Sequence, residues 1–277
     1  MAESVVPVID IAPFLAGGAE DKARVVAEVD AACRDIGFLV ISGHGVPDTE
    51  TRELQRVARA FFDLPHWEKL RVKMPPDRYR GFMAVGNEDV AYSMEKAEKA
   101  PDWRESFVTG PSNHAYDEYH YGPDGWRFFA ANLWPDNPPE MRQLWQAYYL
   151  QMERLAGDLM RIFALALGLD EHFFADKIDK HITNFTTCYY PPQLTPPEKN
   201  QLRCGPHSDY GSLTIVTSDT PVGGLQVRGK DGAWSDVPCI PGTFTVNLGD
   251  LMAEWTNDRW RSTLHRVVNP PRTEADS

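Results

Sequence analysis

The sequence lacks a long apolar segment and has no excess of positive charge. Its 277 residues contain no run of about 18 apolar side chains, the length that a membrane-spanning helix needs. The N-terminus also lacks the basic and then apolar pattern of a secretory leader. Lysine and arginine together number 28 against 40 acidic residues, which gives a net charge of −12. We therefore expect neither a membrane nor a nucleic acid as partner.

Cysteine is scarce as well. The four cysteines, Cys33, Cys188, Cys204 and Cys239, include no C-x-x-C pair. In a chain of this length such spacing is typical of free thiols in a reducing compartment, so we expect a cytoplasmic protein. The acidic surface favours solubility and does not specify an oligomeric state.

Residues 1–137 form an N-terminal α/β region followed by loops in our interpretation. Apolar spacing predicts a strand, a helix, a buried strand and a second helix between residues 5 and 64. Residues 74–137 show no sustained periodicity and are dense in aromatic side chains. We expect this stretch to consist of loops whose rings pack onto the core.

The rest of the chain divides into a helical and a β part. Apolar side chains three and four apart between residues 141 and 163 predict one long helix within 138–180, and a short helix is expected over 171–178. Residues 181–277 carry short strands between turns rich in glycine and proline, typical of an antiparallel sandwich or barrel. We predict a single domain, 1–277, in which the helices buttress a β core.

The residues that carry chemistry lie in the β part. His207 and Asp209 precede a β-branched run, and since side chains alternate along an extended segment, both face the same way. His265 lies in a second strand-like segment. Two imidazoles and one carboxylate on a β scaffold, with coordination positions left open, are typical of non-haem Fe(II) sites that react with oxygen. A His-x-Asp pair also arises by chance, and a lone histidine in a strand is usually an ordinary core or surface residue.

A polar face is predicted on segment 182–190. Alternation places five side chains on one side of it: Ile182, Asn184, Thr186, Cys188 and Tyr190. This face is more polar than a packed core requires, so Asn184, Cys188 and Tyr190 are candidates for binding a small polar co-substrate beside the metal. A core tyrosine whose hydroxyl bonds to backbone is an equally good interpretation of Tyr190.

A series of short motifs runs along nearly the whole chain. In order they are 8–10 (Val-Ile-Asp), 37–38 (Gly-Phe), 43–47 (Gly-His-Gly-Val-Pro), 189–192 (Tyr-Tyr-Pro-Pro), 207–209 (His-Ser-Asp), 223–227 (Gly-Gly-Leu-Gln-Val), 241–242 (Pro-Gly), 246–250 (Val-Asn-Leu-Gly-Asp), 255–257 (Trp-Thr-Asn) and 264–268 (Leu-His-Arg-Val-Val). Together they resemble the non-haem Fe(II), 2-oxoglutarate-dependent dioxygenases of the isopenicillin N synthase-like branch.

The resemblance implies a mainly β fold, a double-stranded β-helix (jelly-roll) core with flanking helices. It implies that His207, Asp209 and His265 hold Fe(II), that 2-oxoglutarate and O2 are co-substrates, and that no catalytic side chain is needed beyond the metal ligands. The implied activity is the hydroxylation, desaturation or cyclisation of a small organic molecule, with release of succinate and CO2. The protein would position the substrate and exclude stray water.

Two departures from the family pattern affect the co-substrate site. The family has an asparagine where this chain has Cys188, and an Arg-x-Ser beyond the last histidine ligand for the far carboxylate of 2-oxoglutarate. Here Arg272 has no serine two positions on, and no closing strand or helix follows before Ser277. We therefore expect that the C-terminal end of the domain is missing from these residues. Tyr190 is then the remaining candidate for that carboxylate.

Other interpretations of the same residues stay open. The missing Arg-x-Ser fits an Fe(II) oxidase of the same fold that does not use 2-oxoglutarate, or a non-catalytic jelly-roll binding module. A cupin-like zinc hydrolase would use the same two histidines and aspartate. The aromatic residues between 79 and 129 favour a partly apolar small molecule as substrate, with Trp103, Arg104 and Phe107 as candidates for its wall, although packing is the simpler interpretation of these three.

Overall fold

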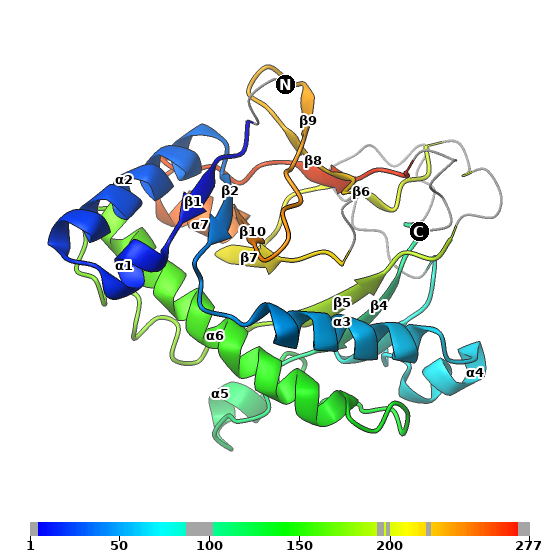
Figure 1. The fold of residues 1–277 in the computed structure, drawn as a ribbon. Helices are drawn as coiled ribbons and strands as arrows, with labels where there is room; N and C mark the ends of the chain where they lie inside the picture. The colour runs from blue at the N-terminus through cyan, green and yellow to red at the C-terminus, as the bar shows by residue number, and fades with distance from the viewer. Residues whose placement is uncertain (1–4, 87–101, 193–196, 198–199, 220–222, 271–277) are drawn as a thin grey trace.

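A computed structural model describes residues 5–86, 102–192, 197, 200–219 and 223–270 (Figure 1). The strands within these residues form three sheets. The first sheet has the order β1 (Val8–Asp10), β2 (Phe38–Ser42), β10 (Phe244–Leu248) and β7 (Leu213–Val216). The second has the order β6 (Cys204–His207), β11 (His265–Val267), β8 (Leu225–Arg228) and β9 (Trp234–Asp236). The third consists of β3 (Gly81–Met83), β4 (Glu105–Thr109) and β5 (Phe185–Tyr189).

Strand β2 connects the N-terminal region to the β core. It pairs in parallel with β1 and antiparallel with β10, with Val40 opposite Thr245. Because its side chains alternate, Leu39 and Ile41 pack among the helices, while Phe38 and Val40 pack against β8 of the second sheet. Burial on both faces explains its unbroken apolar sequence. The N-terminal strands therefore belong to the same β core as the C-terminal ones.

Helices pack against the first and the third sheet. The helices are α1 (Ala12–Ala16), α2 (Ala19–Asp35), α3 (Asp48–Phe62), α4 (His66–Lys69) with a following 3-10 turn (Leu70–Val72), α5 (Glu118–Tyr121), α6 (Met141–Ala166) and α7 (Asp250–Trp255). The long helix α6 confirms the predicted periodicity and runs diagonally across the molecule, packing against α2 and α3 (Figure 1). None of the helices in the described ranges is both long and apolar enough to span a bilayer.

Two predicted features are wrong. Residues 171–178 form successive turns rather than a helix, with the amide of Phe173 bonded to the carbonyl of Asp170 and that of Lys177 to Phe174. Residues 74–137 are not all loops, because β3, β4 and α5 lie within them. Strand β4 is buried at all five positions, so its polar residues carry no alternation that would indicate a strand. The part of this stretch at 87–101, which includes the aromatic Tyr92, lies outside the described residues.

Candidate metal centre

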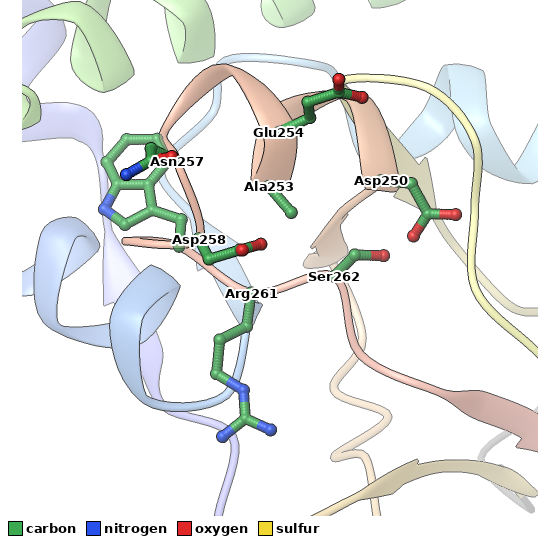
Figure 2. A pocket seen from close by; sticks show the side chains of 8 residues that line it. Asp250, Ala253, Glu254, Asn257, Asp258, Arg261 and Ser262 are labelled. Atoms are coloured by element: carbon green, nitrogen blue, oxygen red, sulfur yellow. The ribbon is translucent and has the colours of Figure 1, made fainter.

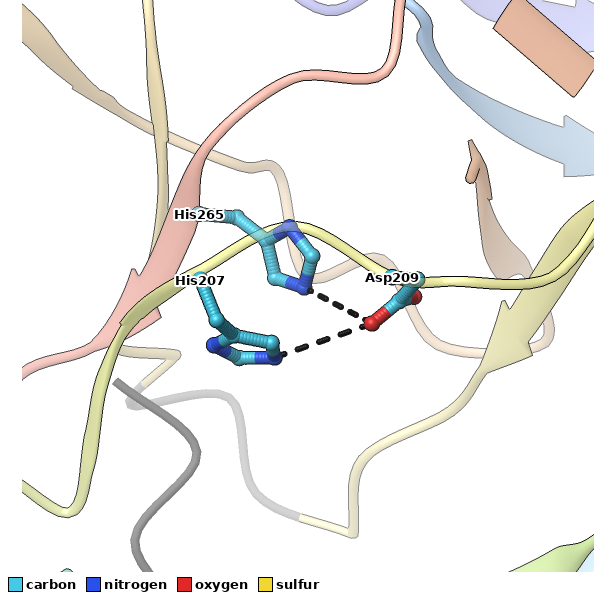
Figure 3. A group of neighbouring side chains, drawn as sticks. All are labelled: His207, Asp209 and His265. Atoms are coloured by element: carbon cyan, nitrogen blue, oxygen red, sulfur yellow. Dashed lines mark ion pairs between the residues drawn. The ribbon is translucent and has the colours of Figure 1, made fainter. Parts of the chain in front are cut away.

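Strand pairing brings the three predicted ligands to one point (Figure 3). His207 is the last residue of β6 and lies directly opposite His265, the first residue of β11. Asp209 follows two residues after His207, in the loop that leads to β7. Its Oδ1 atom is 3.7 Å from Nε2 of His207 and 3.6 Å from Nε2 of His265. One donor atom from each residue lies within 4.8 Å of the other two.

Both imidazole rings are oriented by backbone carbonyls. Nδ1 of His207 is 2.8 Å from the carbonyl oxygen of Gly205, and Nδ1 of His265 is 3.1 Å from that of Thr263. Since a carbonyl can only accept, Nδ1 carries the proton in both rings and Nε2 presents its lone pair. A hydrogen bond on the second ring nitrogen is the usual way in which proteins orient a metal-binding histidine.

The environment also sets the charge state of these groups. Burial, followed by the proximity of His207, lowers the pKa of His265 although Asp209 acts against this, so the neutral form that binds a metal is favoured. Burial would raise the pKa of Asp209, yet the neighbouring His265 and hydrogen bonds from Thr214 and Asn247 lower it overall. The site therefore presents a neutral imidazole at His265 and a carboxylate at Asp209.

The residues present fit an iron ion. Neighbouring donors of an octahedral ion with metal–ligand bonds of about 2.1 Å lie about 3.0 Å apart. The separations of 3.6 and 3.7 Å between the imidazole nitrogens and Oδ1 are slightly wider than this, so small side-chain rotations are enough for these donors to bind one ion. Two nitrogen donors and one oxygen on one side of an ion are the facial set that suits Fe(II).

Helix α7 holds the loop that carries Asp209. The amide of Asp250 donates to the carbonyl of Asp209 at 2.7 Å, and that of Leu251 donates to the carbonyl of Tyr210 at 3.2 Å. Gly249, just before α7, allows this approach, because an added Cβ would lie 2.2 Å from the carbonyl oxygen of Gly211 and 2.7 Å from that of Asp209. The 246–250 motif thus supports the metal centre by holding the backbone of the Asp209 loop in place.

Replacing Gly249 with alanine should therefore damage both stability and metal binding. We expect the free energy of unfolding to fall by about 1–3 kcal/mol, as for other overpacked sites, and Fe(II) affinity to fall because the Asp209 loop must shift. Gly211→Ala is the matched control, since a Cβ there meets nothing within 4 Å. Urea unfolding and Fe(II) titration of both variants measure the difference, and equal behaviour of the two would contradict this role of Gly249.

The predicted co-substrate residues fall into two groups. Cys188 and Tyr190 both contact Arg104, whose Nη1 is 3.9 Å from Sγ of Cys188, while Tyr190 shares a side-chain hydrogen bond with it. The same Nη1 is 3.6 Å from Sγ of Cys204, which lies 3.8 Å from Nδ1 of His207. These contacts connect Cys188 and Tyr190 to the metal centre. Burial raises the pKa of Tyr190 well above its ordinary value, so its hydroxyl stays protonated.

Asn184 has a different neighbour. Its Oδ1 accepts a hydrogen bond of 2.9 Å from Nη1 of Arg80, a fully buried arginine. The guanidinium of Arg80 also donates to the carbonyl oxygens of Tyr79 and Phe128. Burial lowers the pKa of Arg80 to about 10. The side chain of Asn184 therefore helps to fix a buried cation. Arg272, considered above for the far carboxylate, lies outside the described residues.

A pocket of about 640 Å³ borders α7 on the side of the following loop (Figure 2). Its lining includes three carboxylates, those of Asp250, Glu254 and Asp258, and none of the three metal-site residues. The carboxylate of Asp250 accepts a hydrogen bond of 3.2 Å from the hydroxyl of Ser208, between His207 and Asp209. The pocket is thus adjacent to the metal centre and separate from it.

Three supporting residues were not identified from sequence: Thr214, Asn247 and Gly249 contact Asp209 or its loop. Arg104 was predicted only as a candidate for the substrate wall, and it contacts the predicted co-substrate residue Cys188. Asn247 and Gly249 lie in the 246–250 motif, so the sequence contained a signal for them without indicating their roles.

Family profiles match both halves of the chain. One described as "non-haem dioxygenase in morphine synthesis N-terminal" matches residues 6–137, and one described as "2OG-Fe(II) oxygenase superfamily" matches residues 182–276. The validamycin A dioxygenase of Streptomyces hygroscopicus subsp. limoneus is 35% identical over 96% of this chain and 72% of its own length. A homoarginine-6-hydroxylase of Glycine max is 36% identical over 96% of this chain and 81% of its own.

Solved structures show the same architecture. A full-length protein of Neurospora crassa, crystallised with alpha-KG and thymine, superimposes with a TM-score of 0.82 at 29% identity, covering 98% of this chain and 82% of the Neurospora protein. A 2OG-Fe(II) oxygenase family protein of Caulobacter crescentus superimposes with a TM-score of 0.84 at 25% identity, covering 99% and 84%. The predicted jelly-roll core with flanking helices is confirmed by this similarity.

Proposed function

The chain belongs to the 2OG-Fe(II) oxygenase superfamily, and we propose that His207, Asp209 and His265 are the three protein ligands of its Fe(II). The observation that carries this proposal is that both imidazoles turn Nε2 toward the same carboxylate oxygen, Oδ1 of Asp209. The carbonyls of Gly205 and Thr263 keep the rings in this orientation.

The protein is a 2-oxoglutarate-dependent non-haem iron dioxygenase that oxidises a small molecule and uses Fe(II), 2-oxoglutarate and O2. Bound Fe(II) and the keto acid supply the oxidising power, and the protein supplies orientation and exclusion of water. Membership of this family favours 2-oxoglutarate-dependent oxidation over an oxidase without that co-substrate, a binding module or a zinc hydrolase. We propose hydroxylation as the outcome, supported by the similarity to the homoarginine-6-hydroxylase.

We propose that Tyr190 and Cys188 line the co-substrate site beside Arg104, which connects them to the metal centre through Cys204. Asn184 lies directly before β5, the strand that contains Cys188, and would contribute to this site by holding the guanidinium of Arg80 in place.

We also propose that residues 1–277 act as one oxygenase domain, supported by the pairing of β2 with β10. A cytoplasmic location is proposed because all four cysteines are free thiols.

Succinate formation tests the function. The protein would be incubated with Fe(II), 2-oxoglutarate, O2 and a panel of candidate substrates. The panel includes validamycin A and homoarginine, which appear in the names of two relatives, and thymine, which is bound in the Neurospora structure. We expect one panel member or a chemical analogue to stimulate succinate release in a one-to-one ratio with O2 uptake and hydroxylated product. Substrate-dependent O2 uptake without succinate would contradict the proposal.

A further inference from the structure

The two oxygens of the Asp209 carboxylate have different surroundings. Oδ1 faces Nε2 of His207 and His265, as described above. Oδ2 instead accepts two hydrogen bonds, one from the hydroxyl of Thr214 and one of 2.7 Å from the side-chain amide of Asn247. We call Thr214 and Asn247 the carboxylate clamp. The clamp occupies the oxygen that does not face the imidazoles.

The clamp is built into the first sheet. Thr214 in β7 and Asn247 in β10 are direct partners in the strand register, so their side chains lie next to each other on one face. Asn247 is only 2% exposed, which leaves its amide no solvent partner. The two donors are therefore positioned by strand pairing, and the Asp209 loop is fitted against them.

Carboxylates bind cations through one oxygen or through both. An octahedral ion with three protein donors keeps three positions open, enough for the two oxygens of a keto acid and for O2. If Asp209 bound through both oxygens, only two positions would remain. Rotation of Oδ2 onto the ion would also require it to give up both hydrogen bonds of the clamp, and leaving the buried amide of Asn247 unpaired is unfavourable.

We propose that Thr214 and Asn247 are positioning residues that restrict Asp209 to coordination through Oδ1. They thereby leave three positions on the metal open for the co-substrates, where coordination through both oxygens would leave two. This inference rests on the proposed ligand set. It assigns to the clamp an effect on 2-oxoglutarate chelation that is separable from retention of the metal.

The test is an anaerobic titration of the Fe(II)-loaded protein with 2-oxoglutarate, followed by the weak visible charge-transfer band of the chelate. Thr214→Val keeps the shape of the side chain and removes the hydroxyl, whereas Thr214→Ser keeps the hydroxyl and is the matched control. We expect Thr214→Ser to titrate like the unmodified protein. Thr214→Val should still bind one Fe(II) per chain. The 2-oxoglutarate concentration that gives half of the maximal band intensity should rise about 10-fold, in the range known for outer-shell changes.

The double variant Thr214→Val/Asn247→Ala should show a larger shift, toward about 100-fold. Because Thr214 is only partly buried, the single variant still gives an answer if the double variant does not fold. A folded Thr214→Val protein that titrates like Thr214→Ser would overturn the proposal, and so would one that no longer binds Fe(II). Failure of the proposed function would appear differently, as unmodified protein that gives no band at all.

Discussion

His207→Ala should reduce 2-oxoglutarate-dependent turnover by more than about 100-fold, because loss of an outer-shell partner alone costs about 10- to 100-fold in metal sites. The substitution removes one of the two nitrogen donors that face Oδ1 of Asp209. The protein should remain folded, since the imidazole of His207 is partly exposed and its hydrogen bond to Gly205 is local. Succinate release under saturating Fe(II) measures the loss.

His181→Ala is the matched control for this prediction. His181 also uses both ring nitrogens, contacting Thr183 at 2.8 Å and Glu153 at 2.7 Å, but it lies outside the metal centre. We expect its turnover to stay within about twofold of the unmodified protein, as for surface changes remote from a site. Equal losses in the two variants would mean that His207 acts through general folding and does not hold the metal.

Glu105→Gln should cause the largest loss of stability, about 3–5 kcal/mol in the free energy of unfolding. Glu105 in β4 and Lys69 form an ion pair of 2.6 Å, and their side chains are only 9% and 7% exposed. Lys69 also donates to the carbonyl of Phe62 at 2.8 Å and lies over the ring of Phe82. Neutralising the carboxylate leaves the buried ammonium without a counter-charge. Urea unfolding measures the effect.

Two further variants separate the buried charge from the lost contact. Lys69→Met/Glu105→Leu removes both charges and should recover most of the stability, because apolar pairs replace buried ion pairs with little loss. Asp63→Ala breaks an exposed pair with Arg59, in which the side chains are 54% and 55% exposed, and should cost less than about 1 kcal/mol. A double variant as unstable as Glu105→Gln would contradict this explanation.

The C-terminal strands could be predicted because their signals are local. The strands of the 181–277 part lie between turns at positions such as Gly232 and Gly242, both of which have the left-handed backbone that glycine readily adopts. The spacing of His207 and Asp209 similarly predicted two donors on one side, and the structure brings them together. Short-range alternation was sufficient for these features.

Other parts of the fold depend on partners that are distant in sequence. Strand β4 buries Glu105 and Ser106, and the charge that balances the buried Glu105 carboxylate comes from Lys69, outside the strand. Strand β2 pairs with β10 about 200 residues later, and neither segment alone indicates the other. Helix α7 has six residues, too few to show a helical period.

The supporting residues of the metal centre were missed for the same reason. Thr214 and Asn247 become a clamp only because β7 and β10 pair with those two residues in register. Arg104 was predicted as a candidate for the substrate wall, but its contacts with Cys188 and Cys204 span 84 and 100 residues and could not be predicted locally. A sequence pattern indicates which residue types can bind a metal, while the residues that orient them follow from tertiary pairing.

X-ray absorption at the iron edge of anaerobic, Fe(II)-loaded protein tests the ligand set most directly. We predict a nearest shell of nitrogen and oxygen atoms only, at about 2.1 Å, with the outer-shell scattering of two imidazoles and open positions that 2-oxoglutarate fills when added. Sγ of Cys204 lies 3.8 Å from the ring of His207, so a sulfur ligand is the nearby alternative. A sulfur atom at about 2.3 Å, or a shell without imidazole scattering, would contradict the assignment of His207, Asp209 and His265.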